Sequence, residues 1–138
     1  MLNHTVKRRL LVIDDEQDIT LTLSTVLRES GFEVVSFNDP LLALRSFRPR
    51  YYDLVILDIR MPHMNGFELY REIRRKGNGV KVCFLTAVNE FREYEQYRHE
   101  AYPKLGERHF IAKPVSNHEI TRRVNEMLTN DKDYLENT

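Results

Sequence analysis

Five short apolar runs recur along the chain, and each is rich in Val, Ile, Leu or Phe. Runs of this kind are typical of strands that are covered on both faces of a sheet. They predict strands at residues 10–13, 32–37, 54–57, 80–85 and 109–112.

The segments between these runs carry apolar residues at helical spacing. Asp39 followed by Pro40 is typical of a helix N-cap with proline at the first helical position. The spacing predicts helices at about residues 19–29, 40–47, 66–76, 89–101 and 117–128.

Strands that alternate with helices imply a parallel sheet with right-handed crossovers. Five such units fit an α/β, doubly wound five-stranded parallel sheet with strand order 2-1-3-4-5, as in flavodoxin-like folds. In this order a crevice opens at the carboxyl ends of the first and third strands. We expect a single domain at residues 1–129, followed by a polar tail at residues 130–138.

Acidic residues stand where two of the predicted strands end. Asp14 and Asp15 follow the first run, and Asp58 follows the third. Three carboxylates that converge on one crevice repel one another unless a cation neutralises them. A small ion held by carboxylates, water and phosphate is the Mg²⁺ pattern. Capping of the first helix is the alternative role for Asp14 and Asp15.

Two more polar groups are expected at the same edge of the sheet. The fourth run ends at Thr86, beside the small Ala87, and the fifth leads to Lys113, beside Pro114. A hydroxyl, an ammonium and Mg²⁺ around Asp58 would together meet the anionic oxygens of a phosphoryl group.

These motifs resemble the receiver domain of two-component response regulators over about residues 7–128. The resemblance rests on four stretches: residues 12–16, residues 58–66, Thr86-Ala87 and Lys113-Pro114. It implies a receiver fold and a phospho-accepting function in two-component signal transduction. It also implies that the chain is no enzyme but a phosphorylation switch, one that supports its own Mg²⁺-dependent phosphotransfer and dephosphorylation.

The resemblance assigns roles to the residues of the site. Asp58 would accept the phosphoryl group, Lys113 would pair with it, and Thr86 would bind a phosphate oxygen and move inward. The implied protein ligands of Mg²⁺ are Asp14, Asp15, Asp58 and the backbone carbonyl of Arg60.

Other implied roles concern the switch and its tuning. Phe110 matches the switch aromatic, whose ring becomes buried as Thr86 moves, although plain core packing is the alternative. The Lys113–Pro114 bond would be cis. Arg60 and Val88 occupy positions that border the phosphate in the family, so we expect them to alter the lifetime of the phosphorylated state.

The stretch between Thr86 and Lys113 is longer than is usual in the family and lacks the usual Gly-Ala-rich turn. We expect a lengthened helix at 89–101 that breaks before Pro103. Its apolar stripe favours core packing, with a partner or dimer surface as the alternative. The aromatic residues of this segment are Phe91, Tyr94, Tyr97 and Tyr102.

The expected partners follow from the resemblance. A sensor histidine kinase or a phosphotransfer protein would donate the phosphoryl group. The output would be a downstream protein target or a homodimer, through a surface formed by the helix at 89–101, the strand at 109–112 and the helix at 117–128.

Composition narrows the remaining partner classes. The chain has 21 basic and 21 acidic residues, so no net field attracts nucleic acid or an anionic membrane, and we expect contact with neither. No apolar run approaches the roughly 20 residues that span a bilayer, so a cytoplasmic protein is expected. The single cysteine, Cys83, lies in an apolar run and is interpreted as an inert buried thiol. The five histidines share no metal-ligand spacing and are interpreted as surface residues.

Three other functions use similar elements. A pseudo-receiver would dock a partner without phosphorylation, but such proteins usually lack one of the five site residues. A haloacid-dehalogenase-like phosphohydrolase places Asp-x-Asp after the first strand, whereas Glu16 stands two residues after Asp14 here. A flavodoxin-like cofactor binder would have to place a phosphate in the acidic loop from Asp14 to Asp18, which repels it unless a metal intervenes.

Overall fold

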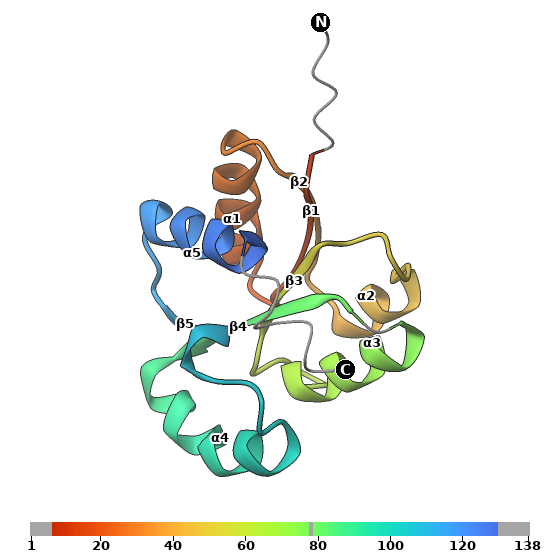
Figure 1. Ribbon diagram of the computed structural model, residues 1–138, viewed down its shortest axis with the longest axis vertical. Helices are drawn as coiled ribbons and strands as arrows, with labels where there is room; N and C mark the ends of the chain where they lie inside the picture. The colour runs from red at the N-terminus through yellow and green to blue at the C-terminus, as the bar shows by residue number, and fades with distance from the viewer. Residues whose placement is uncertain (1–6, 78, 130–138) are drawn as a thin grey trace, which may run out of the picture.

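A parallel sheet forms the centre of the computed structural model, which describes residues 7–77 and 79–129. Its strands are β1 (Arg9–Ile13), β2 (Glu33–Phe37), β3 (Leu54–Asp58), β4 (Lys81–Ala87) and β5 (Phe110–Lys113). They pair in the order β2-β1-β3-β4-β5 (Figure 1), so the predicted fold class and strand order are confirmed.

Helices cover the two faces of this sheet. They are α1 (Gln17–Glu29), α2 (Pro40–Ser46), α3 (Gly66–Lys76), α4 (Val88–Ala101) and α5 (Asn117–Thr129), and a short 3₁₀ turn (Glu107–His109) precedes β5. Helices α1 and α5 lie together on one side of the sheet, and α2 and α3 lie on the other (Figure 1). No helix among the described residues is long and apolar enough to cross a bilayer.

Local chemistry determines where the helices begin. Asp39 accepts a hydrogen bond from the backbone N–H of Leu41 at 2.9 Å, so the predicted N-cap of α2 is present. Helix α3 begins with a capping box, in which Asn65 accepts from the N–H of Glu68 and Glu68 accepts from the N–H of Asn65. These bonds satisfy N–H groups that a helix start leaves without intrahelical partners.

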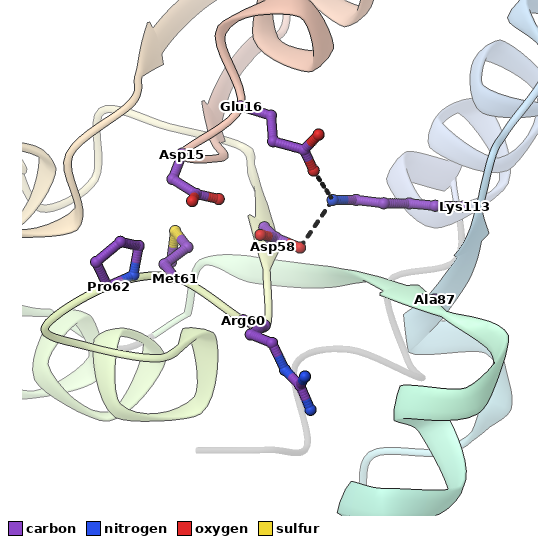
Figure 2. Close-up of a pocket in the computed structure, with 8 residues that line it drawn as sticks. All are labelled: Asp15, Glu16, Asp58, Arg60, Met61, Pro62, Ala87 and Lys113. Carbon is purple, nitrogen blue, oxygen red and sulfur yellow. Dashed lines mark ion pairs between the residues drawn. The ribbon is translucent and has the colours of Figure 1, made fainter.

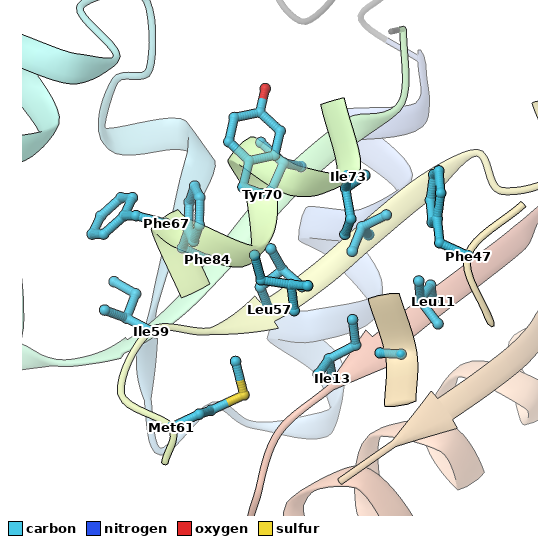
Figure 3. Packing of buried hydrophobic residues seen from close by; sticks show 14 of the residues in the cluster. Leu11, Ile13, Phe47, Leu57, Ile59, Met61, Phe67, Tyr70, Ile73 and Phe84 are labelled. Atoms are coloured by element: carbon cyan, nitrogen blue, oxygen red, sulfur yellow. The ribbon is translucent and has the colours of Figure 1, made fainter. Parts of the chain in front are cut away.

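The central strands supply two cores because their successive side chains point to opposite faces. One core combines Leu10, Val12, Leu54 and Ile56 with residues of α1 and α5. The other combines Leu11, Ile13, Val55 and Leu57 with residues of α2 and α3, as Figure 3 shows for part of the cluster. Each fully buried Leu or Ile stabilises the fold by about 1.5–3 kcal/mol. Burial in the two cores therefore fixes the sheet between the helices on its two faces.

The segment from α4 to β5 packs against α3. Helix α4 ends at Ala101, before Pro103 as predicted. Tyr94 and Tyr102 are partly buried against the core, in agreement with the packing interpretation. Tyr97 is 42% exposed, although its ring centroid lies 5.3 Å from that of Phe67. The side chain of Phe91 lies outside the described part of the structure.

Two buried polar residues show what the sequence pattern missed. His109 is fully buried and its Nδ1 accepts a hydrogen bond from the N–H of Gly106 at 2.9 Å, so the surface interpretation was wrong for this histidine. The 3₁₀ turn directs it inward.

Lys81 is also buried, and its Nζ donates to the carbonyls of Met127 at 3.0 Å and Leu128 at 3.2 Å. An ammonium therefore caps the C-terminus of α5, where carbonyls lack helical partners.

Cys83 is fully buried, and burial raises the pKa of its thiol to about 12, in agreement with the inert role. The predicted polar tail at 130–138 lies outside the described residues.

We expect Gly66→Ala to lower the free energy of unfolding by about 1–3 kcal/mol, as overpacking does. A Cβ on Gly66 would lie 2.4 Å from the carbonyl oxygen of Asp58, where only backbone can yield. Gly106→Ala is the matched control, because a Cβ there meets nothing within 4 Å. Urea unfolding measures both, and equal stabilities of the two variants would contradict the expected close approach.

Replacement of Lys81 by Met should also destabilise the fold, by about 1–3 kcal/mol, because the α5 carbonyls lose their charged donor. The apolar chain length is nearly kept, so lost packing contributes little. Lys7→Met, at an exposed position, is the control and should unfold like the parent. Thermal unfolding of the two variants tests this, and a parent-like Lys81→Met would refute the capping role.

Candidate functional site

Charged side chains meet at the carboxyl edge of the sheet. Asp14 follows β1, Asp58 ends β3 and Lys113 ends β5. Both carboxylates are buried, with 0% and 3% of Asp14 and Asp58 exposed. Lys113 Nζ lies 2.9 Å from Asp14 Oδ2 and 2.9 Å from Asp58 Oδ1; Figure 2 shows the contact with Asp58. The sheet therefore brings together three residues that the sequence singled out.

Lys113 reaches these carboxylates across the end of β4. The residue paired with Lys113 on β4 is Ala87, whose small side chain leaves the path open. Glu16 Oε1 lies 3.5 Å from the same ammonium on the exposed side. One ammonium thus contacts three carboxylates, and the contact with Glu16 was not predicted from the sequence.

The loop after β1 orients Asp14. Asp14 Oδ1 accepts a hydrogen bond from the N–H of Glu16 at 2.9 Å, and Asn38 Nδ2 donates to the Asp14 carbonyl at 2.8 Å. Glu16 is the N-cap residue of α1 and makes no side-chain cap bond. Asp14 and Asp15 are therefore not the N-cap residues of α1, which was the alternative role. The contribution of Asn38 depends on tertiary contact and had no signal in the sequence.

Burial dominates the electrostatics of the site. It raises the pKa of Asp58 to about 7, where the Lys113 hydrogen bond works in the opposite direction and the charge of Asp14 adds to the rise. Burial also raises the pKa of Asp14, against the hydrogen bond from Glu16 N–H. Burial lowers the pKa of Lys113, but its bonds to Asp14 and Asp58 outweigh burial and raise that pKa. The carboxylates outnumber the ammonium, so the site favours an additional cation.

Three carboxylates have the spacing of a metal site. One oxygen each from Asp14, Asp15 and Asp58 lie within 4.8 Å of one another. Asp14 Oδ2 lies 2.9 Å from Lys113 Nζ, and no other described residue donates a hydrogen bond to this oxygen. Hard carboxylate oxygens with free lone pairs fit a small divalent cation. The donor set therefore fits Mg²⁺ chemistry.

An open hollow of about 570 Å³ gives access to Asp58. The side chain of Arg60, which lines it, points away from Asp58 (Figure 2). The full lining is Asp15, Glu16, Asp58, Arg60, Met61, Pro62, Ala87 and Lys113.

Neither of the two expected switch residues lines this hollow. Thr86 is buried, does not line the hollow, and its hydroxyl donates to the Ala87 carbonyl at 3.0 Å. Phe110 is only 7% exposed and its ring stacks on that of Phe84, with centroids 5.3 Å apart. The Phe110 ring is thus already in the core, which leaves little surface to bury on activation.

Two other expectations from the sequence concern Pro114 and Val88. The expected cis Lys113–Pro114 bond is present. Val88 is the first residue of α4, and its side chain lies outside the described part of the structure.

Comparisons with known proteins agree with this geometry. The sequence model of the response regulator receiver domain matches residues 10–125. A CpxR homolog from Haemophilus influenzae, named a transcriptional regulatory protein, is 36% identical over 120 residues, which cover 87% of this chain and 50% of that protein. The non-phosphorylated HemR receiver domain from Leptospira biflexa is 30% identical, with a TM-score of 0.75 and coverage of 89% and 95%.

A third similar protein was solved with a bound metal ion. The receiver domain of the sensor histidine kinase PA1611 from Pseudomonas aeruginosa was solved with a magnesium ion coordinated in its active site cleft. It is 25% identical to this chain, with a TM-score of 0.70 and coverage of 91% and 100%.

One expectation from the sequence needs correction. The chain was predicted to be no enzyme, yet to support its own phosphotransfer and dephosphorylation. This prediction was wrong as stated, because it denied enzymatic activity and at the same time claimed two promoted reactions. The family match supports a receiver domain and confirms no claim about enzymatic activity.

The chain spans about half the length of the curated relatives it matches. Within that span the family model covers most of the chain, and the relatives exceed 30% identity. The predicted resemblance is therefore confirmed, together with the phospho-accepting function in two-component signalling that it implied. The chain belongs to the response regulator receiver domain family.

Proposed function

We propose that Asp58 is the phosphoacceptor, and that it takes a phosphoryl group from the phosphohistidine of a sensor histidine kinase or a phosphotransfer protein. In this step the bond between phosphorus and the histidine nitrogen breaks, and a bond forms between phosphorus and an Asp58 carboxylate oxygen. The observation that carries the proposal is the position of Asp58, at a strand end in an open hollow and 2.9 Å from Lys113 Nζ.

The neighbouring carboxylates are less suited to accept the group. Asp14 is fully buried, does not line the hollow, and has one oxygen bound by the N–H of Glu16. Asp15 is exposed. Of these three aspartates, Asp58 combines access through the hollow with a 2.9 Å contact to Lys113 Nζ.

Lys113 has a role both before and after the transfer of the phosphoryl group. Before it, the ammonium offsets the repulsion between Asp14 and Asp58. Afterwards, the same ammonium would pair with an oxygen of the phosphoryl group, which carries more negative charge than the carboxylate it replaces. Thr86 would then rotate its hydroxyl from the Ala87 carbonyl toward a phosphate oxygen.

Mg²⁺ is the proposed cofactor. Asp14, Asp15, Asp58 and the backbone carbonyl of Arg60 would hold it, and the magnesium ion in the PA1611 receiver domain supports this assignment. When bound, Mg²⁺ offsets negative charge on the oxygens of the transferred group. The protein supplies the carboxylates and keeps them close together through β1 and β3.

Phosphorylation would shift an equilibrium between inactive and active conformations. The surface of α4, β5 and α5 is the proposed output, used by a downstream protein target or a second copy of the chain. Phe110 remains a candidate relay, Arg60 and Val88 remain candidate tuning positions, and kinase partnership would place the protein in the cytoplasm.

Incubation with acetyl phosphate and Mg²⁺ should add the mass of one phosphoryl group to the intact protein. Asp58→Asn should prevent the adduct, because the amide is not a nucleophile for phosphorus. Asp18→Asn, at an exposed position on α1, is the control and should react like the parent. An adduct that survives in Asp58→Asn would contradict the proposed acceptor.

Mg²⁺ should raise the unfolding temperature, because an ion that binds the folded state stabilises it by mass action. The rise should be larger at pH 8 than at pH 6. The pKa of Asp58 is raised to about 7, so below that pH Mg²⁺ must displace a proton and above it the carboxylate is free to bind. Scanning calorimetry at the two pH values measures the difference.

The same titration in Asp58→Asn should show most of the rise lost. Glu29→Gln, which removes an exposed carboxylate at the end of α1, should keep it. A parent-like rise in Asp58→Asn would show that Mg²⁺ binds elsewhere.

A further inference from the structure

Three arginines gather on the C-terminal half of α3. Arg71, Arg74 and Arg75 have the i, i+3 and i+4 spacing that places side chains on one helix face. Together with Tyr102 they line a hollow of about 240 Å³, here called the arginine hollow. No carboxylate belongs to its lining among the described residues, in contrast to the hollow at Asp58.

Tyr102, which lines one side of the arginine hollow, is held in place by packing against α3. The Tyr102 ring lies 5.3 Å from the Tyr70 ring, and its hydroxyl is 3.4 Å from the Phe67 carbonyl, to which it donates. This wall comes from the long segment between α4 and β5, which carries Tyr102 onto α3. The charges of Arg71 and Arg74 act on Tyr102, and both oppose the rise that burial causes in its pKa. The two cations therefore lie near the phenol.

Neighbouring groups orient the guanidinium groups. Arg74 lies over the ring of Tyr70 at 5.5 Å, within cation–π range. Glu72 Oε2 lies 3.5 Å from Arg71 Nε and 3.0 Å from Arg75 Nη1. One carboxylate, that of Glu72, therefore orients the guanidinium groups of both Arg71 and Arg75.

We propose that the arginine hollow binds a small phosphate-bearing anion. Guanidinium groups match phosphate oxygens through paired N–H donors, and three of them suit a tetrahedral group with several charged oxygens better than a planar carboxylate. Pockets for drug-sized ligands measure roughly 300–1,000 Å³. At about 240 Å³ the hollow fits a phosphate or diphosphate group, with any attached portion outside.

The arginine hollow is separate from the site at Asp58. Gly66, at the start of α3, contacts the Asp58 backbone, and Arg74 follows eight residues later. At 1.5 Å per residue these positions are about 12 Å apart along the helix. The Asp58 site attracts cations, whereas the arginine hollow attracts anions.

Calorimetric titration of the metal-free protein with sodium pyrophosphate at constant ionic strength tests the proposal. We expect saturable binding that Arg75→Gln weakens about tenfold, the effect of losing one charge-assisted hydrogen bond. The Arg75 side chain is 68% exposed, so its replacement should leave the fold intact. Arg45→Gln makes the same charge change outside the hollow and should alter the dissociation constant less than twofold.

Parallel titrations identify the source of the phosphate group. Inorganic phosphate represents the free anion and O-phosphoserine represents a modified side chain. If Arg75→Gln weakens the binding of either ligand and Arg45→Gln does not, the proposal is supported. The ligand whose binding is weakened is the form that the hollow accepts.

Three outcomes would overturn the proposal: no binding of any of these ligands, equal weakening in both arginine variants, or loss of binding in Asp58→Asn. The last would place the anion at the Asp58 site. Failure of Asp58 to accept a phosphoryl group leaves this titration unaffected, so the two proposals fail separately.

Discussion

The carboxyl edge of the sheet depends on one ammonium. Asp14 and Asp58 are buried side by side, and without a cation at least one of them would have to be protonated. Lys113 supplies the cation from β5, across β4, and contacts both carboxylates at 2.9 Å. Loss of one partner from a buried ion pair costs about 3–5 kcal/mol. The proposed chemistry therefore uses a contact on which the charge balance of the folded edge also depends.

This edge could be predicted from the sequence for a simple physical reason. Buried parallel strands read as apolar runs, and a polar residue that ends such a run must lie at the carboxyl edge. Asp58, Thr86 and Lys113 are recognisable in this way, and Asp39-Pro40 marks a helix start by local backbone chemistry alone. In each case the signal lies within a few residues of the position it predicts.

Features that depend on contacts between distant segments gave no such signal. His109 is buried because a 3₁₀ turn directs it inward, and Lys81 is buried because the end of α5 lies beside the start of β4. The position of the Phe110 ring likewise depends on Phe67 and Phe84, which come from two other elements. Residue type and spacing carry no information about these neighbours. The motifs therefore predict where Thr86 and Phe110 lie in the fold but not how their side chains are oriented.

Helix α3 connects the Asp58 site with the arginine hollow. Its first residue, Gly66, has no room for a side chain against the Asp58 carbonyl, and its last turns carry the arginines. The zero net charge conceals this arrangement, because acids gather at one end of α3 and cations at the other. A rigid helix shifts as a unit, so a change at Asp58 that moves Gly66 would also move the arginines at the other end of α3. If the hollow binds an anion more tightly in one position of α3, thermodynamic linkage requires the anion to favour the matching state of Asp58 by the same factor.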